Sequence, residues 1–369
     1  MKKLLKRAAV ILGGAVVLVA VLAVSFVDFD SLGGEASGPR LERIEQSPHY
    51  QDGRFVNLEP TEVMLGGSFW SSTREFLFGS DRREPSGPLP SVKPDLSEFP
   101  TSDTALEVIW LGHSTVLMAL DGAVLLIDPV FDENASTVAG VARRFQPTPV
   151  MREDLPPVDA VVISHDHYDH LEMSSVRFFS EQGPPFFVPL GVGAHLEVWG
   201  VPEKQIVELE WGQSYNRGPL ELVCTPARHF SGRSLLDRDQ TLWASWTFLG
   251  PNHRVFYSGD TGPSAEFTNI GEQYGPFDLT IIQIGAYGES WPLIHMTPEE
   301  VIEVHLALKG KKLLPVHWGT FDLALHDWDE PIRNTAASAA LNGVELLTPR
   351  LGERVDIDRP FESRAWWQD

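Results

Sequence analysis

Residues 161–171 of the chain read VVISHDHYDHL. Three histidines and two aspartates fall within six positions, directly after an apolar run that is typical of a buried strand. On an extended segment, residues two apart point the same way, so His165 and His167 are expected to face one point. Past the following bend, Asp169 and His170 are expected to face a second point. Imidazole and carboxylate groups suit Zn²⁺, with iron or manganese as alternatives, and no thiolate is required.

Three further metal-ligand candidates each follow an apolar run elsewhere in the chain. They are His229 after LELVCTPAR, Asp260 in FYSGDTG and His317 in LLPVHWGTF. Side chains that follow several parallel or mixed strands meet at one edge of a sheet, where many α/β proteins have their active site. Taken singly, Asp260 could belong only to a turn and His317 only to the core. Together with the histidine-rich stretch they predict one site assembled from four parts of the chain.

Short apolar or β-branched runs predict a strand-rich body from residue 105 onward. These runs cover residues 106–112, 114–120, 123–129, 159–164, 220–226, 241–250, 254–260, 278–285 and 311–318. Asp121-Gly122 predicts a two-residue hairpin turn. In TPEEVIEVHLALKG, Thr297 as N-cap, Glu300 in a capping box and Gly310 at the end predict a helix. Hairpins followed by alternating strands and helices indicate an α/β fold in which helices cover sheets.

The N-terminal residues 1–30 have the composition of a membrane anchor or signal segment. Residues 8–27 carry no charge in twenty positions and follow the basic sequence MKKLLKR. A helix of that length spans about 30 Å, the thickness of a bilayer core, and its basic flank is expected to stay in the cytoplasm. We therefore expect a single N-terminal transmembrane helix and an extracytoplasmic body, periplasmic or on the cell surface. The alternative is a cleaved signal peptide and a secreted protein.

Residues 31–104 are rich in Gly, Pro, Ser and charged side chains, which predicts a linker and N-terminal arm, with Phe69-Trp70 docked on the body. The formal net charge of -22 argues against a nucleic-acid partner, because affinity for a phosphate backbone comes from Lys and Arg. Cys224 is the only cysteine, which excludes an internal disulfide and a four-cysteine zinc site.

The spacing H-x-H-x-D-H followed by a distant His, Asp and His resembles the metallo-β-lactamase superfamily. The resemblance implies a four-layer αβ/βα sandwich over residues 105–369, the catalytic domain, with two divalent ions, expected to be Zn²⁺, at one edge between two sheets. It implies one ion on His165, His167 and His229. It implies a second ion on Asp169, His170 and His317, with Asp260 bridging the two.

A narrower resemblance is carried by WLGHSTVL (110–117), IDPVF (127–131), LWASWTFLGP (242–251), FDLTIIQIGAY (277–287) and HMTPEE (295–300). These stretches look like the branch of N-acylphosphatidylethanolamine-hydrolysing phospholipase D and bacterial RomA-like proteins. In that branch, a histidine at the position of His295 is implicated in catalysis. Asp169 is expected to bind metal and to orient the nucleophile. His113, in the GHST turn, is expected either to support a ligand from behind or to make a structural hydrogen bond.

The expected activity is hydrolysis by a hydroxide held between two metal ions. The resemblance favours a phosphodiester substrate, most simply a phospholipid such as N-acylphosphatidylethanolamine cleaved on the phospholipase D side. One alternative is a small ester, lactone or cyclic phosphodiester; the non-enzymatic alternative is a structural metal-binding module. The sequence leaves the oligomeric state open.

A long loop, residues 130–158, is expected to border the site because loops of this length are usually functional or disordered. It carries Arg143 and Arg144, which could meet a phosphate, and Phe145, which could meet an acyl chain. The alternative is that the loop merely covers the sheet.

Overall fold

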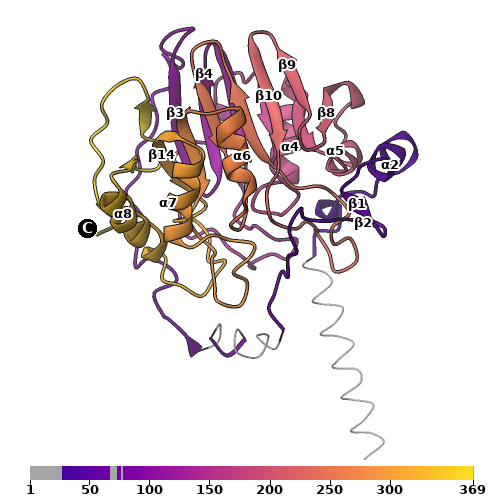
Figure 1. Cartoon of the computed structure of the whole chain (residues 1–369), viewed down its shortest axis with the longest axis horizontal. Helices are drawn as coiled ribbons and strands as arrows, with labels where there is room; N and C mark the ends of the chain where they lie inside the picture. The colour runs from indigo at the N-terminus through magenta and orange to yellow at the C-terminus, as the bar shows by residue number, and fades with distance from the viewer. Residues whose placement is uncertain (1–26, 67–72, 76–77, 369) are drawn as a thin grey trace, which may run out of the picture.

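The apolar runs of the sequence form two seven-stranded sheets that face each other. The computed structural model describes residues 27–66, 73–75 and 78–368. The first sheet has the order β16-β3-β4-β5-β6-β7-β8 and the second has the order β15-β14-β13-β12-β11-β10-β9. Figure 1 shows α6, α7 and α8 in front of the sheets and α4 behind them.

The strands of the first sheet are β16 (Arg354–Asp356), β3 (Leu106–Gly112), β4 (Thr115–Leu120), β5 (Ala123–Ile127), β6 (Ala160–Val162), β7 (Phe186–Pro189) and β8 (Ile206–Leu209). Those of the second are β15 (Glu345–Leu346), β14 (Gly310–Val316), β13 (Phe277–Gln283), β12 (Arg254–Tyr257), β11 (Ser245–Leu249), β10 (Leu220–Thr225) and β9 (Ser214–Arg217). The helices are α2 (Gly38–Glu45), α4 (Met173–Gln182), α5 (Gly193–Val198), α6 (Glu266–Gln273), α7 (Pro298–Ala307) and α8 (Glu330–Asn342). A small hairpin, β1 (Tyr50–Gln51) and β2 (Arg54–Phe55), precedes both sheets.

Alternation along β3 explains the layering. Val108 and Trp110 belong to the core shared with the second sheet and with α6, α7 and α8, whereas Ile109 and Leu111 belong to the core under α4 and α5. Successive strand residues point to opposite faces, so an apolar run buried on both faces supplies two cores at once. The result is the predicted α/β sandwich of four layers, helix, sheet, sheet and helix.

All nine predicted strands are present, with bounds that differ by a few residues. The sequence did not indicate β7, β8, β9, β15 and β16, which are two to four residues long. Strands this short show too little alternation to be recognised. β7 also ends in Pro189.

The hairpin and the capped helix follow local sequence signals. Asp121 and Gly122 both have positive φ, 48° and 87°, as a tight two-residue hairpin turn requires, and they join β4 to β5. Thr297 and Glu300 form the predicted capping box of α7. The expected end of that helix was wrong, because Lys309, not Gly310, has the positive φ of 58° and Gly310 already begins β14.

The predicted transmembrane helix lies almost wholly outside the described residues, as does Phe69-Trp70, so neither prediction is tested. Over the described ranges, no helix has both the length and the apolar character needed to cross a bilayer.

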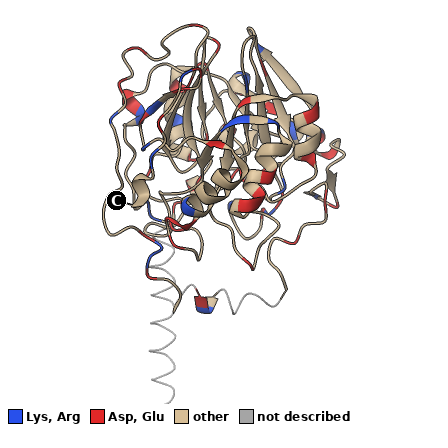
Figure 2. Cartoon of the chain, turned by 60° about the vertical axis from the view of Figure 1, so that its left-hand side comes forward, with Lys and Arg blue, Asp and Glu red and all other residues tan. Residues whose placement is uncertain are grey.

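The predicted arm contains α2 and the β1–β2 hairpin. Ile44 of α2 and Phe55 of β2 are 1% exposed and join the core of the second sheet. Figure 2 shows Asp and Glu spread over helices and loops, with Lys and Arg scattered between them.

Candidate metal centre

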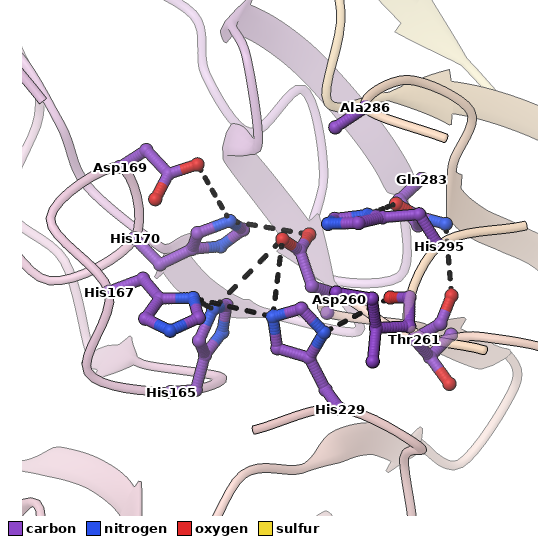
Figure 3. Close-up of polar contacts among 12 residues, drawn as sticks. His165, His167, Asp169, His170, His229, Asp260, Thr261, Gln283, Ala286 and His295 are labelled. Carbon is purple, nitrogen blue, oxygen red and sulfur yellow. Dashed lines mark hydrogen bonds and ion pairs between the residues drawn. The ribbon is translucent and has the colours of Figure 1, made fainter. Parts of the chain in front are cut away.

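Four strand ends bring the seven predicted ligands to one edge of the sandwich. The motif 165–170 follows β6, His229 follows β10, Asp260 follows β12 and His317 follows β14. In the second sheet, β13 pairs in parallel with both β12 and β14, and β10 and β12 both run antiparallel to β11, so the ends of β10, β12 and β14 lie at one edge of that sheet. In Figure 3 the imidazoles of the motif and of His229 surround the carboxylate of Asp260.

The first group of side chains contains His165, His167 and His229. The distance from His167 Nδ1 to His165 Nε2 is 2.8 Å and to His229 Nε2 is 3.3 Å. Asp260 Oδ2 lies 4.0 Å from His165 Nε2 and 3.8 Å from His229 Nε2. Three ring nitrogens and one carboxylate oxygen therefore converge on one point.

The second group contains Asp169, His170 and His317, again with Asp260. Asp169 Oδ2 lies 3.5 Å from His170 Nε2 and 3.4 Å from His317 Nε2. Asp260 Oδ1 lies 3.3 Å from His170 Nε2, and its Oδ2 lies 3.0 Å from His317 Nε2. Asp260 is thus the side chain that faces both groups.

Several of these atoms are buried without a hydrogen bond. They include His170 Nε2, Asp260 Oδ1 and His317 Nε2, whose short mutual distances lack hydrogen-bond geometry. Leaving such atoms unsatisfied costs about 1–3 kcal/mol each, and more for a charged group. A pair of divalent ions on these lone pairs would remove that cost, so the residues present fit two metals, and both groups consist of nitrogen and oxygen donors that suit zinc.

The ring nitrogens that face away from the centre are held by other groups. His229 Nδ1 lies 3.0 Å from the carbonyl of Ile294, and His165 Nδ1 lies 3.0 Å from Ser164 Oγ. His170 Nδ1 lies 2.7 Å from Asp128 Oδ2. Such outer contacts fix the tautomer and the ring orientation of a metal-binding histidine.

Asp128 is a functional candidate that sequence reasoning missed. It is fully buried and accepts hydrogen bonds from Ser164 N at 2.7 Å, from the Ser164 hydroxyl and from Tyr257 OH, besides His170. The available signal was the same one that marked the ligands: a polar residue directly after an apolar strand, here β5.

The charge of the centre is set by close pairing. Burial alone would raise the pKa of Asp260, but His170 and His317 beside it hold that pKa well below its usual range. Burial opposes protonation of His317, yet Asp260 and Asp169 raise its pKa to about 9. The carboxylates therefore stay ionised, and His317 carries a proton that a bound metal ion would displace.

His295 lies two residues before the N-cap of α7 and faces the centre. Its Nδ1 lies 2.7 Å from Gln283 Oε1, and its ring stands 5.2 Å from that of His229. Gln283 donates its Nε2 to the carbonyl of Thr261, so its Oε1 must accept from His295 Nδ1. Burial lowers the pKa of His295 to about 3. The ring is therefore neutral, with its proton on Nδ1 and a free lone pair on Nε2.

His113 contacts the second group directly. Its Nε2 lies 2.9 Å from Asp169 Oδ2, and its backbone carbonyl accepts from His317 N and from Trp110 Nε1. It has a positive φ of 49° in the turn between β3 and β4. The residue combines both roles that the sequence left open, support of Asp169 and a structural hydrogen bond.

Arg143, Arg144 and Phe145 lie on the loop between β5 and β6, and each has contacts of its own. Arg144 donates to the carbonyls of Asp132 and Val130, at 3.1 and 2.7 Å, and its guanidinium stacks over Phe321. Arg143 is exposed and lies 3.7 Å from Glu133. Phe145 packs against the core. These contacts give Arg144 and Phe145 structural partners, and a role in substrate binding stays a prediction.

A small pocket opens beside the second group. His113, His317, Phe145 and Phe321 are among its lining residues. Asp169 and His167 are only partly buried, unlike the other five predicted ligands. The centre is therefore approached from the side of the 165–170 motif.

The arm also reaches the centre, which the sequence gave no reason to expect. Asn57 Nδ2 donates to the carbonyl of His229 at 2.7 Å, and Asn57 Oδ1 accepts from His229 N at 3.1 Å. Trp243 Nε1 donates to the same oxygen. The arm thus fixes the backbone of a predicted ligand.

Comparison with known proteins places this geometry in a family. The model of the Beta-lactamase superfamily domain matches residues 124–318. An uncharacterised protein of Mycobacterium tuberculosis is 46% identical over 349 residues, covering 92% of each chain. The N-acyl-phosphatidylethanolamine-hydrolyzing phospholipase D 1 of Caenorhabditis elegans is 37% identical over 262 residues, covering 68% of this chain and 73% of its own length.

Solved structures agree on the fold. A metallo hydrolase from Ignicoccus hospitalis aligns with a TM-score of 0.55 at 22% identity, covering 70% of this chain and all of its own. From its fold, the donor groups at its sheet edge and these relatives, the chain belongs to the metallo-β-lactamase superfamily as a metal-dependent hydrolase.

Proposed function

We propose that the protein is a dinuclear zinc phosphodiesterase that hydrolyses a phospholipid of the N-acylphosphatidylethanolamine type on the phospholipase D side. The observation that supports it best is the buried set of unpartnered donor atoms on His170, His317 and Asp260. A structural zinc site is a closed cage of four ligands, whereas seven donors around a bridging carboxylate suit two ions. The substrate class rests on the 37% identity to the nematode phospholipase D.

The proposed ligand assignment follows the two groups. His165, His167 and His229 would hold one ion, Asp169, His170 and His317 the other, and Asp260 would bridge them. When bound, the ions would supply Lewis-acid chemistry that polarises a phosphoryl oxygen and activates water near neutral pH.

His295 is the proposed proton carrier. Its Nε2 lone pair is free because Nδ1 donates to Gln283. The anionic phosphodiester would raise the pKa of His295 on binding, so that Nε2 can accept the proton of the attacking water and return it to the alkoxide that leaves phosphorus. Gln283 keeps a proton on Nδ1 throughout, so that Nε2 is the nitrogen that gains and loses the transferred proton.

Asp169 is proposed to orient the nucleophile. His113 donates to Asp169 Oδ2, which fixes that carboxylate while its side chain stays 14% exposed. A partly exposed, oriented acceptor beside the second group can hold the water in line with the scissile bond.

The remaining predictions complete the proposal. Residues 105–369 would form the catalytic domain, residues 31–104 a wrapping arm, and residues 1–30 a single membrane anchor that places the body outside the cytoplasm. Anchoring would put the enzyme at the surface where its lipid substrate is found.

The test combines metal analysis with product analysis on a panel of defined phospholipids. The full chain is expected to carry two zinc ions and to release phosphatidic acid and an N-acylethanolamine from N-acylphosphatidylethanolamine. Asp260→Asn is expected to lose metal and to abolish turnover. Asp278→Asn changes an aspartate that bonds Lys311 and Arg254 on the far side, and serves as the matched control with full activity.

Two results would overturn the proposal. Turnover of small esters or lactones without release of phosphatidic acid would reject the phospholipid substrate. A chain with both metals bound that turns over no substrate class would reject the enzymatic mechanism.

A further inference from the structure

Two adjacent leucines stand almost fully in solvent beside the metal centre. Leu235 is 99% and Leu236 is 96% exposed. Single exposed apolar residues are ordinary, but a group of large ones marks a contact surface. Packing of the folded core therefore does not explain why two leucines stand at these positions.

The turn that carries the leucines is held by its own polar groups. Asp237 Oδ1 accepts from Ser234 N at 2.8 Å and from Arg233 N at 3.2 Å. Leu236 N donates to Ser234 Oγ at 3.1 Å. The backbone is thus fixed without help from the leucine side chains, which it presents outward.

Two other segments lie against this turn and add apolar side chains. Arg233 Nε donates to the carbonyl of Ser31 at 2.9 Å, and Asp28 N donates to the carbonyl of Thr137 at 2.8 Å. The segment 27–31 therefore lies between the leucine turn and residues 137–141. Phe29 is 57% and Val141 is 52% exposed. Together, Phe29, Val141, Leu235 and Leu236 form what we call the apolar rim.

The apolar rim is tied to the metal-binding motif. Gly232 N donates to Asp166 Oδ1 at 2.8 Å, and Tyr168 OH donates to the carbonyl of Arg233 at 2.7 Å. The Arg233 guanidinium lies 4.0 Å over the Tyr168 ring. The rim therefore borders the side of the motif where Asp169 is partly exposed.

We propose that the apolar rim inserts into a lipid bilayer and sets the metal centre against the membrane surface. The course of the chain supports this occupant. The uncharged residues 8–27, the stretch best suited to lipid, end at Val27, which pairs with Val138 inside the rim. A chain that leaves a bilayer at Val27 brings Phe29, Val141 and the leucines to the same surface.

The charges near the rim indicate how it binds. Asp28 and Asp30 are exposed on the segment between the turns, and Arg143 and Arg238 are exposed beside it. Arg143 lies beside Glu133 and Arg238 beside Asp239, so Asp28 and Asp30 leave an acidic excess. Binding is therefore expected to come from apolar insertion and not from attraction to anionic lipid, with little dependence on salt. This inference deepens the proposed function by naming the surface from which the site takes lipid, but its test does not depend on catalysis.

The test is a depth measurement with a polarity-sensitive fluorophore on the full chain. Cys224 is buried, so Leu235→Cys offers one accessible thiol among the described residues. On phosphatidylcholine vesicles the probe is expected to shift to the blue, to become protected from an aqueous quencher by fivefold or more, and to be quenched by nitroxide-labelled acyl chains. Val141→Cys, labelled in the same way, is expected to give the same result.

Leu341→Cys is the matched control, since Leu341 is 88% exposed on α8, away from the rim. Its probe is expected to remain open to the aqueous quencher with vesicles present. A probe at Leu235 that stays equally open would overturn the inference, as would protection that disappears in 1 M salt. Protection that appears without lipid and rises with protein concentration would assign the rim to a second copy of the chain, and would also overturn it.

Discussion

Two clusters of histidine and aspartate stand at opposite ends of the sheets, and they differ in how their polar atoms are satisfied. At one end, beyond β6 and β12, ring nitrogens and a carboxylate oxygen are buried without a hydrogen bond. At the other end, beyond β4 and β11, Asp121 accepts from Asn252 N, Asn252 Nδ2, His253 N and His253 Nδ1 at 2.8–3.1 Å. His253 Nε2 in turn lies 3.1 Å from Asp358.

The comparison separates a ligand site from a structural one. At His253 both ring nitrogens have protein partners, so the cluster needs nothing more and simply ties the hairpin of the first sheet to the turn of the second. At His170 one nitrogen is held by Asp128 and the other is left for a ligand. Residue type alone does not distinguish the two; the count of unsatisfied atoms does.

Removing the metal is expected to have the largest effect on stability, and to act only at the end of the sheets beyond β6 and β12. A ligand present at about 1,000 times its dissociation constant contributes about 4 kcal/mol to stability, which corresponds to a fall in Tm of roughly 5–10 °C on chelation. Hydrogen exchange should rise in residues 163–171 and 258–262 and stay unchanged around Asp121-Gly122. Calorimetry and exchange before and after chelation measure both. An unchanged Tm after complete metal removal would show that the centre is satisfied without ions.

Asp128→Asn tests the outer support of the metal centre. The asparagine keeps the size and tolerates the positive φ of 39°, but it has one acceptor oxygen where Asp128 uses two for Ser164, His170 and Tyr257. Loss of such a partner typically reduces metal affinity or activity by about 10–100-fold. Zinc titration and turnover measure the change. Asp121→Asn is the matched control and should leave zinc affinity and turnover unaltered. A loss of metal in Asp121→Asn would contradict the conclusion that only one end of the sheets is a metal site.

Asp121→Ala tests the structural end. The substitution leaves Asn252 and His253 without their acceptor, at a cost of about 3 kcal/mol in the free energy of unfolding. Metal content and turnover per folded molecule should stay at wild-type values. Urea unfolding together with zinc analysis separates the two quantities, and coupled losses would argue that the hairpin also shapes the metal site.

The pH dependence of the His253 cluster should be the smallest effect. Burial opposes the charged ring, but Asp121 and Asp358 raise the pKa of His253 above its usual value. A raised folded pKa contributes stability that is full below about pH 6.5, the unfolded value, and is lost as pH rises through the folded value. His253→Gln should therefore cost more at pH 6 than at pH 9, by less than about 1 kcal/mol. Unfolding at both pH values measures it, and an equal cost would mean that the ring binds its partners uncharged.

Much of the fold could be read from the sequence because its signals are local. β3, β4 and β5 are long apolar runs, Asp121-Gly122 closes a hairpin, and the Thr297–Glu300 box begins α7. The short strands β7, β8 and β9 could not be read, since a few residues show no clear period. Their pairing depends on neighbours far away in the chain.

In the candidate site, too, some residues could be predicted from the sequence and others could not. The ligand candidates follow apolar strands, so their residue types and order were visible. Gln283 and Asn57 were not indicated, because each acts through a hydrogen bond to a residue at least 12 positions away, Asn57 across 172. Asp128 showed only its position directly after a strand, and its bond to His170 spans 42 positions. Leu235 and Leu236 also look like core residues until the turn that exposes them is seen.

The sequence by itself determined the strand runs, the capped helix and the donor groups of the metal centre, because backbone propensity and residue chemistry are properties of short segments. Only the tertiary structure decided which ring nitrogens remain free, which carboxylate supports them and which apolar side chains reach solvent. Those outcomes depend on how distant strands pack, since a hydrogen bond forms only between atoms within about 3 Å, whatever their separation along the chain.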